Sequence, residues 1–440
     1  MTNPRYILLI TSLFIVYTQG LWERMFGFSP AIKLISEAFI FLYLLLSIKY
    51  FRKKTPGNVL FLIYLIISFI GSIINGSDPV AWLKFVRYFV YFYLLYITLF
   101  HTSISHKQWV FILKFVVFLI LIQGLGSIYN VFILNQRVEG YVGLMSSLGG
   151  TTAATFPLLI VTLSVTFYFF IQPQHKKIYL YLLTCVVSAF LVGYASGKRA
   201  IFFTLPAFIV LITFLSAFLL KGNKLFYKRL IMLGFIVLVL LPVYFFGIKT
   251  TAGVNYYLSG NETNRQMIGN AIEYAINYED SKSAKGLTTG RSGSSVQVIR
   301  NSLQNPSFIL FGQGYGMVKD DNTLSRLGVS YGIVGFTRDI ISAGWIVMFL
   351  TVFIMLSMIF INKSIISSFT TTLRIAIMTI FLFTHFIYSS DFAVSLKLNF
   401  LLVFLLVFIN SPAHTDCLHN LLGSYFYSRS DEKMIDNSNI

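Results

Sequence analysis

The stretch Leu230-Ile-Met-Leu-Gly-Phe-Ile-Val-Leu-Val-Leu-Leu-Pro-Val-Tyr-Phe-Phe-Gly247 runs for 18 residues without a charged side chain. About 20 consecutive apolar residues are enough to cross the hydrocarbon core of a bilayer as a helix. A basic segment precedes this stretch, and the long polar segment 249–332 follows it. The stretch therefore predicts a membrane-spanning helix that joins a basic loop to a polar one.

Apolar runs of this kind recur along nearly the whole chain of 440 residues. Charged residues make up only 11% of the chain, too few to cover the surface of a water-soluble protein of this size. We predict an all-α polytopic integral membrane protein with about twelve transmembrane helices. They are placed near residues 6–21, 31–48, 59–75, 80–100, 109–134, 151–171, 178–195, 200–220, 230–247, 333–361, 371–389 and 392–409.

Alternate loops carry most of the lysines and arginines, which the positive-inside rule assigns to the cytoplasm. Residues 1–248 then hold spans 1–9, residues 333–410 hold spans 10–12, and 411–440 form a cytoplasmic tail. The segment 249–332 becomes one large extracytoplasmic loop between spans 9 and 10, and both termini lie in the cytoplasm. Within this loop we expect helical stretches in 255–278 and 293–303, and turns or irregular backbone at Gly290–Gly293 and Gly312–Gly316. The basic loops contain Lys49, Arg52, Lys53 and Lys54; Lys107; Lys176 and Lys177; Lys221, Lys224, Lys228 and Arg229; and Lys363.

The net charge of +18 is better explained by these cytoplasmic loops lying against anionic lipid than by binding to nucleic acid. The two cysteines and six histidines show no metal-ligand spacing. We therefore predict no nucleic-acid partner, no disulfide, no metal site and no cofactor. The first apolar run is followed by Trp22-Glu-Arg24 rather than by a small-residue cleavage site, so it is expected to remain as a span.

Several cations break the positive-inside pattern at the outer ends of spans. They are Lys84 and Arg87, Lys198 and Arg199, Arg338 beside Asp339, and Lys397, with His385 in the outer half of span 11. Charge inside a membrane is costly and usually faces a cavity or a partner. A salt bridge such as Arg338–Asp339 explains single cases. The recurrence at one depth favours a cationic cavity for a doubly charged anion such as a lipid-linked pyrophosphate.

Three groups of residues resemble the bacterial O-antigen polymerase and O-antigen ligase families. Ser196-Gly-Lys-Arg199-Ala is similar to a Ser-Arg-small-residue pattern at an outer span end. Thr289-Gly-Arg291, followed by Val298-Ile-Arg-Asn301, Asn305-Pro306 and Phe311-Gly-Gln-Gly-Tyr-Gly316, is similar to the Gly-Arg and Gly-x-Gly patterns of the large loop. Asp321-Asn322-Thr-Leu324 and Tyr331-Gly-Ile-Val-Gly335 are similar to the pattern that leads into the next span.

The resemblance implies a GT-C-like architecture in a bacterial inner membrane. It implies a metal-independent glycosyltransferase that joins undecaprenyl-pyrophosphate-linked oligosaccharides outside the membrane. The donor pyrophosphate leaves as a sugar hydroxyl of the acceptor attacks. Whether a chain-length regulator protein also binds is open. Ligases present His where this chain has Asp321, which favours a polymerase.

On this hypothesis Arg199 and Arg291 hold the pyrophosphate, since a guanidinium binds phosphate oxygens in a bidentate way. Asp321 is the expected base for the hydroxyl, with Asn322 beside it. Further substrate contacts are expected from Lys84, Arg87, Lys198, Arg265, Arg300 and Tyr315, the last by stacking on a sugar ring.

Alternative interpretations stand beside these. Asp320-Asp321 also suits a solvated turn, a helix N-terminus or a Mg²⁺ site. The segment Gly312–Gly316 suits a glycine-permitted turn as well as a phosphate cradle. Glu23 is an alternative base or part of an interfacial cluster. At the level of function, a ligase, a peptidoglycan-type glycosyltransferase and a flippase or exporter of a lipid-linked anion are the competing classes.

The predicted orientation is testable with single cysteines in a background in which Cys185 and Cys417 are replaced by serine. Lys282→Cys and Lys285→Cys should react with an impermeant thiol reagent added outside the cell, because the positive-inside rule places 249–332 there. Lys228→Cys, the control, should react only after permeabilisation. Labelling of positions 282 and 285 from the cytoplasmic side alone would contradict the orientation.

Overall fold

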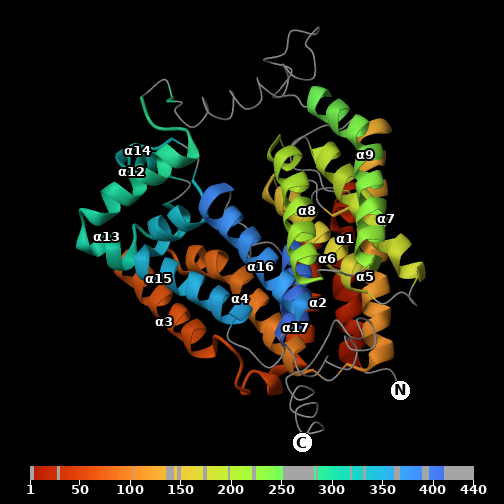
Figure 1. Ribbon diagram of the computed structural model, residues 1–440. Coiled ribbons are helices and arrows are strands. Elements are labelled where there is room, and N and C mark those ends of the chain that lie inside the picture. The colour runs from red at the N-terminus through yellow and green to blue at the C-terminus, as the bar shows by residue number, and fades with distance from the viewer. Residues whose placement is uncertain are drawn as a thin grey trace, which may run out of the picture.

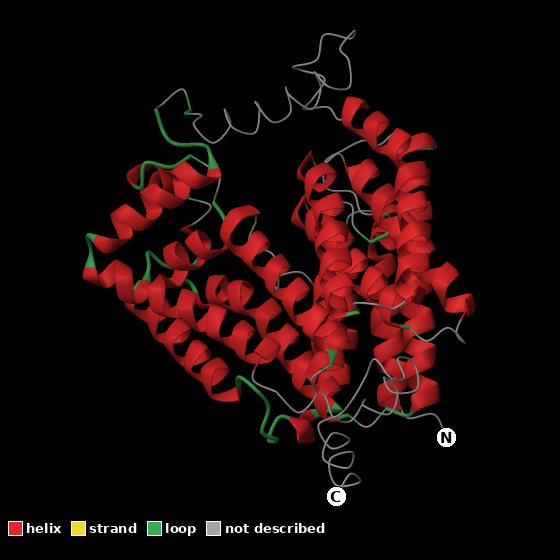
Figure 2. Cartoon of the chain, viewed as in Figure 1, coloured by secondary structure: helices red, strands yellow, loops and turns green. Residues whose placement is uncertain are grey.

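Figure 1 shows the computed structural model, a body of packed helices with a smaller helical layer at one side. The structure describes residues 4–26, 30–102, 104–134, 143–145, 150–171, 176–196, 199–220, 224–250, 282–283, 286–317, 320–330, 333–360, 367–388 and 396–410. In these segments the chain consists of helices and loops (Figure 2). Two isolated bridges, Lys282 with Thr288 and Thr288 with Val329, are the extended pairings found there.

Each of the twelve predicted ranges coincides with a helix. The helices are α1 (Pro4–Phe26), α2 (Pro30–Leu45), α3 (Asn58–Ile74), α4 (Pro79–His101), α5 (His106–Phe132), α6 (Gly150–Phe170), α7 (Lys176–Ser196), α8 (Arg199–Leu219), α9 (Lys224–Thr250), α15 (Gly335–Phe360), α16 (Ser368–Leu382) continued by η4 (Phe383–Tyr388), and α17 (Leu396–Asn410). A short 3₁₀ helix, η1 (Ile48–Tyr50), follows α2.

Length and composition make six of the described helices able to cross a membrane: α1, α4, α5, α7, α15, and α16 with η4. Several shorter apolar helices accompany them. Helix α8 shows why the surface suits lipid. It buries Leu205 and Ile212 against the protein, yet its opposite face exposes Val210, Phe214 and Phe218 by 66%, 68% and 75%. A helix that is apolar on every side belongs in a membrane or a large core. The chain is an all-α membrane protein.

The helices form two groups joined by a central pair. Helix α6 packs on α7 and α8, and α5 packs on α7, whereas α3 packs on α15 and on the short helix α13 (Pro306–Phe311). Helices α16 and α17 lie between the groups, since α16 contacts α6, α8 and α15 and α17 contacts α4 and α6 (Figure 1). The arrangement places α12 (Arg291–Leu303) and α13 beside α15.

The described part of the large loop forms a layer of three helices, α12 (Arg291–Leu303), α13 and α14 (Asp321–Arg326), with a core shared with α15. That core contains Val298, Phe308, Leu324, Leu327 and Val329 from the layer and Ile340, Ile341 and Met348 from α15. The indole of Trp345 also donates a hydrogen bond of 2.9 Å to the hydroxyl of Ser302. The layer is therefore packed firmly on α15.

A helix at 293–303, expected from sequence, is confirmed as part of α12. The turn or irregular backbone expected over Gly290–Gly293 is limited to Gly290, an extended N-cap residue (φ −68°, ψ 151°), and is wrong for residues 291–293, which are helical. The irregular backbone expected over Gly312–Gly316 is confirmed, with φ values of 69°, 107° and 94° at its three glycines. Helical stretches expected within 255–278 lie outside the described residues.

Helix α15 breaks at Gly344, where φ is 85° and ψ is 176°. A Cβ at Gly344 would stand 2.7 Å from the carbonyl oxygen of Leu310, and one at Gly312 would stand 2.6 Å from the amide nitrogen of Ala343. The amide of Gln313 donates to the carbonyl of Ile341 at 2.7 Å, so a backbone group freed by the break gains a partner. Backbone lies against backbone here, and only glycine leaves the space.

Gly344→Ala should destabilise the protein, because the residue would need a backbone region that is essentially confined to glycine and its Cβ would meet Leu310. The expected loss is on the order of 1–3 kcal/mol, seen as a lower midpoint in thermal unfolding of the detergent-solubilised protein. Gly234→Ala on α9 is the control, since a Cβ there meets nothing within 4 Å. Equal midpoints for the two variants would show that the break does not depend on Gly344.

Candidate functional site

The segment η4 lies where the loop layer meets the membrane helices. It continues α16 as a π-helix, a geometry frequent at functional sites. It contacts α15 and α12, so one short segment faces both a span and the large loop. His385 of η4 is directed at α15, and Tyr388 at the end of η4 meets Arg291 of α12.

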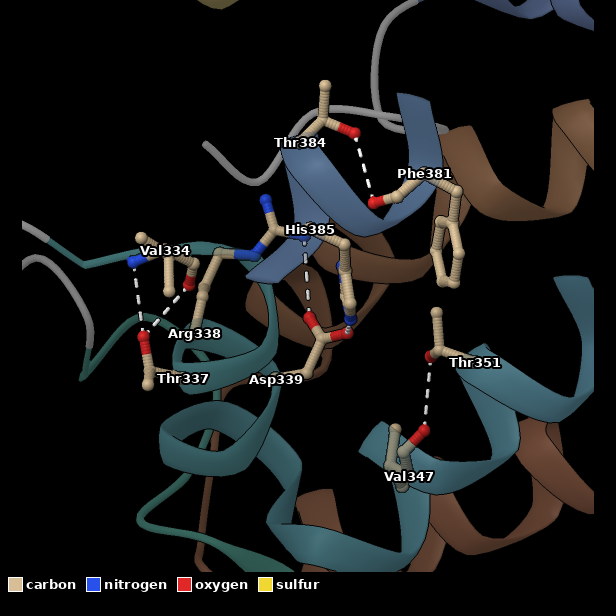
Figure 3. Close-up of polar contacts among 9 residues, drawn as sticks. All are labelled: Val334, Thr337, Arg338, Asp339, Val347, Thr351, Phe381, Thr384 and His385. Atoms are coloured by element: carbon tan, nitrogen blue, oxygen red, sulfur yellow. Dashed lines mark hydrogen bonds and ion pairs between the residues drawn. The ribbon is translucent and has the colours of Figure 1, made fainter. Parts of the chain in front are cut away.

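Asp339 on α15 is the centre of a buried charged cluster with Arg338 and His385 (Figure 3). Its Oδ1 accepts from the Arg338 Nη2 at 3.4 Å, and its Oδ2 lies 3.9 Å from the His385 Nε2. Asp339 and His385 are each 3% exposed. The salt bridge between Arg338 and Asp339, one sequence-based alternative, is present. A charge buried in a membrane protein usually has a partner, and here Asp339 and Arg338 are partners of one another.

Gly335, the last glycine of the motif that leads into span 10, permits this contact. A Cβ at Gly335 would lie 2.6 Å from the His385 Nδ1 and 2.9 Å from the His385 carbonyl oxygen. The start of α15 therefore approaches η4 more closely than a residue with a side chain allows. This explains the glycine in physical terms and sets the distance from His385 to Asp339.

Arg291 is the first residue of α12, after the N-cap Gly290. Its guanidinium carbon lies 4.5 Å from the ring centroid of Tyr388, a cation–π contact. The Tyr388 ring is itself stacked on Phe383, with centroids 5.5 Å apart and an interplanar angle of 8°. Arg291 is half-buried. Arginines from the loop and from span 10 thus both lie beside η4.

Arg338 also faces α4, where its guanidinium carbon lies 5.6 Å from the ring centroid of Phe85. Phe85 packs in turn on Tyr315, at 4.9 Å between centroids. Tyr315 is 3% exposed, its hydroxyl donates to the Ser68 carbonyl at 3.0 Å, and burial raises its pKa. The side chain expected to stack on a sugar instead packs the loop against α3 and α4, with no ring face open to solvent.

The glycine run from 312 to 316 is a docking segment. Three of its five amides are bonded within the protein: Gly312 donates to the Phe308 carbonyl at 3.0 Å, Gln313 to the Ile341 carbonyl at 2.7 Å and Tyr315 to the Ser77 hydroxyl at 3.1 Å. A phosphate cradle needs free amides. The turn interpretation therefore fits the structure, and these three amides are not available to a phosphate.

Asp320 and Asp321 play different parts. Asp320 is the N-cap of α14 and accepts hydrogen bonds from the amide and the hydroxyl of Thr323, at 2.9 and 2.6 Å. These bonds lower the pKa of Asp320. Asp321 is the first residue of α14 and, like Asn322, is exposed. The helix N-terminus interpretation is thus confirmed for Asp320, and it leaves Asp321 facing outward.

The remaining predicted cations are dispersed. Lys84 is exposed near the start of α4, and Arg300 is exposed in the last turn of α12, nine residues from Arg291 and so about 14 Å along the helix. Arg199 begins α8, but its side chain lies outside the described residues, as do Lys198, Arg265 and the side chain of Lys397. The structure brings together Arg291, Arg338 and η4, and it does not bring Arg300 to them.

Arg87 is held by Glu37 of α2, with 3.5 Å between Nη2 and Oε1. The same Nη2 donates to the Tyr88 hydroxyl at 2.7 Å.

Sequence reasoning missed Glu37 and Tyr388. A carboxylate within the predicted span 31–48 was a usable signal for Glu37, because intramembrane acids usually have a cationic partner. Nothing in the sequence indicated that Tyr388 would meet Arg291.

Glu23, expected as an alternative base or as part of an interfacial cluster, has a buried side chain. It is 3% exposed on α1 and accepts a hydrogen bond of 2.7 Å from the Gln19 side chain. The Trp22 indole donates to Thr18 at 2.9 Å. The carboxylate is thus engaged within its own helix.

The chain matches no family model, no curated protein and no solved structure. Function is therefore inferred from its motifs and from the geometry around η4.

Asp339→Asn should destabilise the protein, because it removes the charge that compensates Arg338 in a buried site. Breaking one side of a buried pair costs about 3–5 kcal/mol. Asp321→Asn makes the same chemical change at an exposed position and should leave the unfolding midpoint unchanged. Thermal unfolding of the two variants in one detergent compares them directly. Equal midpoints would show that the Asp339 charge contributes nothing to the fold.

Proposed function

We propose that the chain is a polymerase of undecaprenyl-pyrophosphate-linked oligosaccharide repeat units that forms glycosidic bonds on the outer side of a bacterial inner membrane. In this proposal about twelve helices span the bilayer, both termini are cytoplasmic, and the loop layer lies outside. The order of the three motif groups along the chain and the junction of the loop layer with span 10 support it.

The exposure of Asp321 is the observation that carries the proposal. Six carboxylates belong to the described residues: Glu23, Glu37, Asp78, Asp320, Asp321 and Asp339. Five of them accept a hydrogen bond or pair with a cation, from Gln19, Arg87, Val80, Thr323 and Arg338 respectively. Asp78 and Asp321 are the exposed members of the six, and of these two only Asp321 has no such bond in the described structure. It is the acid available to accept a proton from a substrate.

The arginines supply the second requirement. A pyrophosphate leaving group lies at headgroup level, where the loop layer meets the spans. Arg291, held by the Tyr388 ring, presents a planar cation there, and Arg199 is the second proposed ligand. Charge stabilisation by such groups is commonly the largest catalytic contribution.

In the proposed step a hydroxyl oxygen of the acceptor sugar bonds to the anomeric carbon of the donor. The bond from that carbon to the pyrophosphate oxygen breaks, and its electron pair leaves with undecaprenyl pyrophosphate. Asp321 takes the hydroxyl proton. The reaction needs no nucleotide, since the donor already carries a good leaving group. Aspartate at position 321, where ligases carry histidine, favours repeat-unit polymerisation over transfer to another acceptor.

Asp321→Asn should lower chain extension by on the order of 10²–10⁴-fold, the contribution of a positioned general base, while leaving the protein folded. Polymerisation of purified lipid-linked repeat units in membranes is the assay. Asp320→Asn is the matched control and should retain activity, because asparagine also caps helices. Near-normal extension by Asp321→Asn would remove the base from the proposal, and loss of wild-type activity in a chelator would favour a metal site instead.

In the same assay, Arg291→Lys should already impair extension, since lysine keeps the charge but loses the fork and the stacked geometry. Arg326→Lys, exposed in the last turn of α14, is the control and should not. If Arg291→Ala and Arg199→Ala, each expressed at a normal level, still made full-length polymer, these arginines would not be the ligands of the donor pyrophosphate.

A further inference from the structure

Three cations converge on one tyrosine at the end of the helical body away from η4. The Arg5 guanidinium carbon and the ammonium nitrogens of Lys49 and Lys53 lie 5.5, 5.1 and 5.2 Å from the ring centroid of Tyr50. Arg5 also donates to the Tyr50 hydroxyl at 3.2 Å. Tyr50 is 8% exposed, so its ring is held in place by the protein while it contacts the three cations.

Local backbone structure produces this convergence. Tyr50 closes the 3₁₀ helix η1, its amide donating to Ser47 at 2.9 Å, and the Lys53 amide donates to the Tyr50 carbonyl at 3.0 Å. The chain therefore turns tightly on both sides of Tyr50 and brings Lys49 and Lys53 over the ring. Arg5 joins them from the first turn of α1.

The cluster carries a surplus of positive charge. Among the residues that the structure describes, neither Lys49 nor Lys53 pairs with a carboxylate, and both are exposed, as are Arg52 and Lys54 nearby. The three cations lie within 5.5 Å of one ring centroid, so their like charges repel one another. Such an arrangement is stabilised by an anion that touches several cations at once.

The surroundings indicate the kind of anion. Apolar side chains next to the cluster in the chain are exposed: Ile7 by 49%, Leu45 by 45% and Ile48 by 60%. Cations bordered by exposed apolar residues at helix ends match a phosphate headgroup with acyl chains alongside. A soluble phosphate would not need the apolar border.

The cluster is separate from the candidate active site. The hydroxyl of Thr55, five residues after Tyr50, is hydrogen-bonded to His101 at the last residue of α4, at 2.7 Å. Phe85, which meets Arg338, lies 16 residues earlier in α4. A helix rises about 1.5 Å per residue, so about 24 Å separate the two regions.

We propose that Arg5, Lys49 and Lys53 around Tyr50 form a binding site for an anionic phospholipid, whose phosphodiester contacts the cations while its acyl chains lie along Ile7, Leu45 and Ile48. The bound lipid lies in the leaflet opposite to the one nearest η4. It is independent of the proposed enzymatic function.

Native mass spectrometry of the full chain tests this with phosphatidylglycerol, phosphatidylcholine and inorganic phosphate as probes. The wild type should retain phosphatidylglycerol in preference to phosphatidylcholine. Lys49→Gln with Lys53→Gln should bind it about 30-fold more weakly, from the usual contribution of two lysines near an anionic surface. Lys224→Gln with Lys228→Gln removes the same charge at exposed positions of α9 and should bind normally.

Lys49→Arg with Lys53→Arg keeps both positive charges and should bind phosphatidylglycerol as the wild type does. This variant distinguishes a loss of charge from a loss of local structure. Equal retention of phosphatidylglycerol by the two glutamine double variants would overturn the proposal, as would equal retention of the two lipids by the wild type. Displacement of phosphatidylglycerol by millimolar inorganic phosphate would show a phosphate site without a lipid preference and would also overturn it.

Discussion

The close backbone contact between Gly312 and Gly344 is the constraint that positions the loop layer on α15. At this point the backbone of the loop layer packs against the break in α15, and the Gln313 amide donates a hydrogen bond to the Ile341 carbonyl. A layer joined only through side chains would be free to shift, whereas backbone contact with no intervening Cβ allows one register. Because α12 and α14 share a core with α15, that register fixes Arg291 and Asp321 relative to Arg338 and Asp339.

The charged cluster at Asp339 depends on the same register. A buried ion pair alone is weak evidence for stability, since desolvation offsets the attraction between the charges. Its value here is positional: the Asp339 carboxylate lies between Arg338 of its own helix and His385 of η4, and Gly335 removes the side chain that would keep η4 away. The π-helical turn that brings His385 to Asp339 also carries Tyr388 to Arg291.

The sequence predicted the helices well because hydropathy is a local property and the bilayer sets the length of a span. It also predicted the irregular glycine run, since positive φ is a property of single residues. It did not predict the pairing of Arg87 with Glu37, the burial of Tyr315 or the contact of Arg291 with Tyr388. These partners lie 50 or more residues apart in the chain, and no local pattern encodes which helices become neighbours.

The pairings change how the cations on the loop side act. Five positions there suggested a cationic cavity, yet Arg87 and Arg338 already face carboxylates, Glu37 and Asp339. A pyrophosphate would have to compete with those carboxylates, which already lie 3.5 and 3.4 Å from the two guanidinium groups. Arg291 lies over an aromatic face, the ring of Tyr388. Under the proposed function, Arg87 and Arg338 are therefore less suited to bind the leaving group than their positions in the sequence suggested, because each would have to exchange a nearby carboxylate for the pyrophosphate.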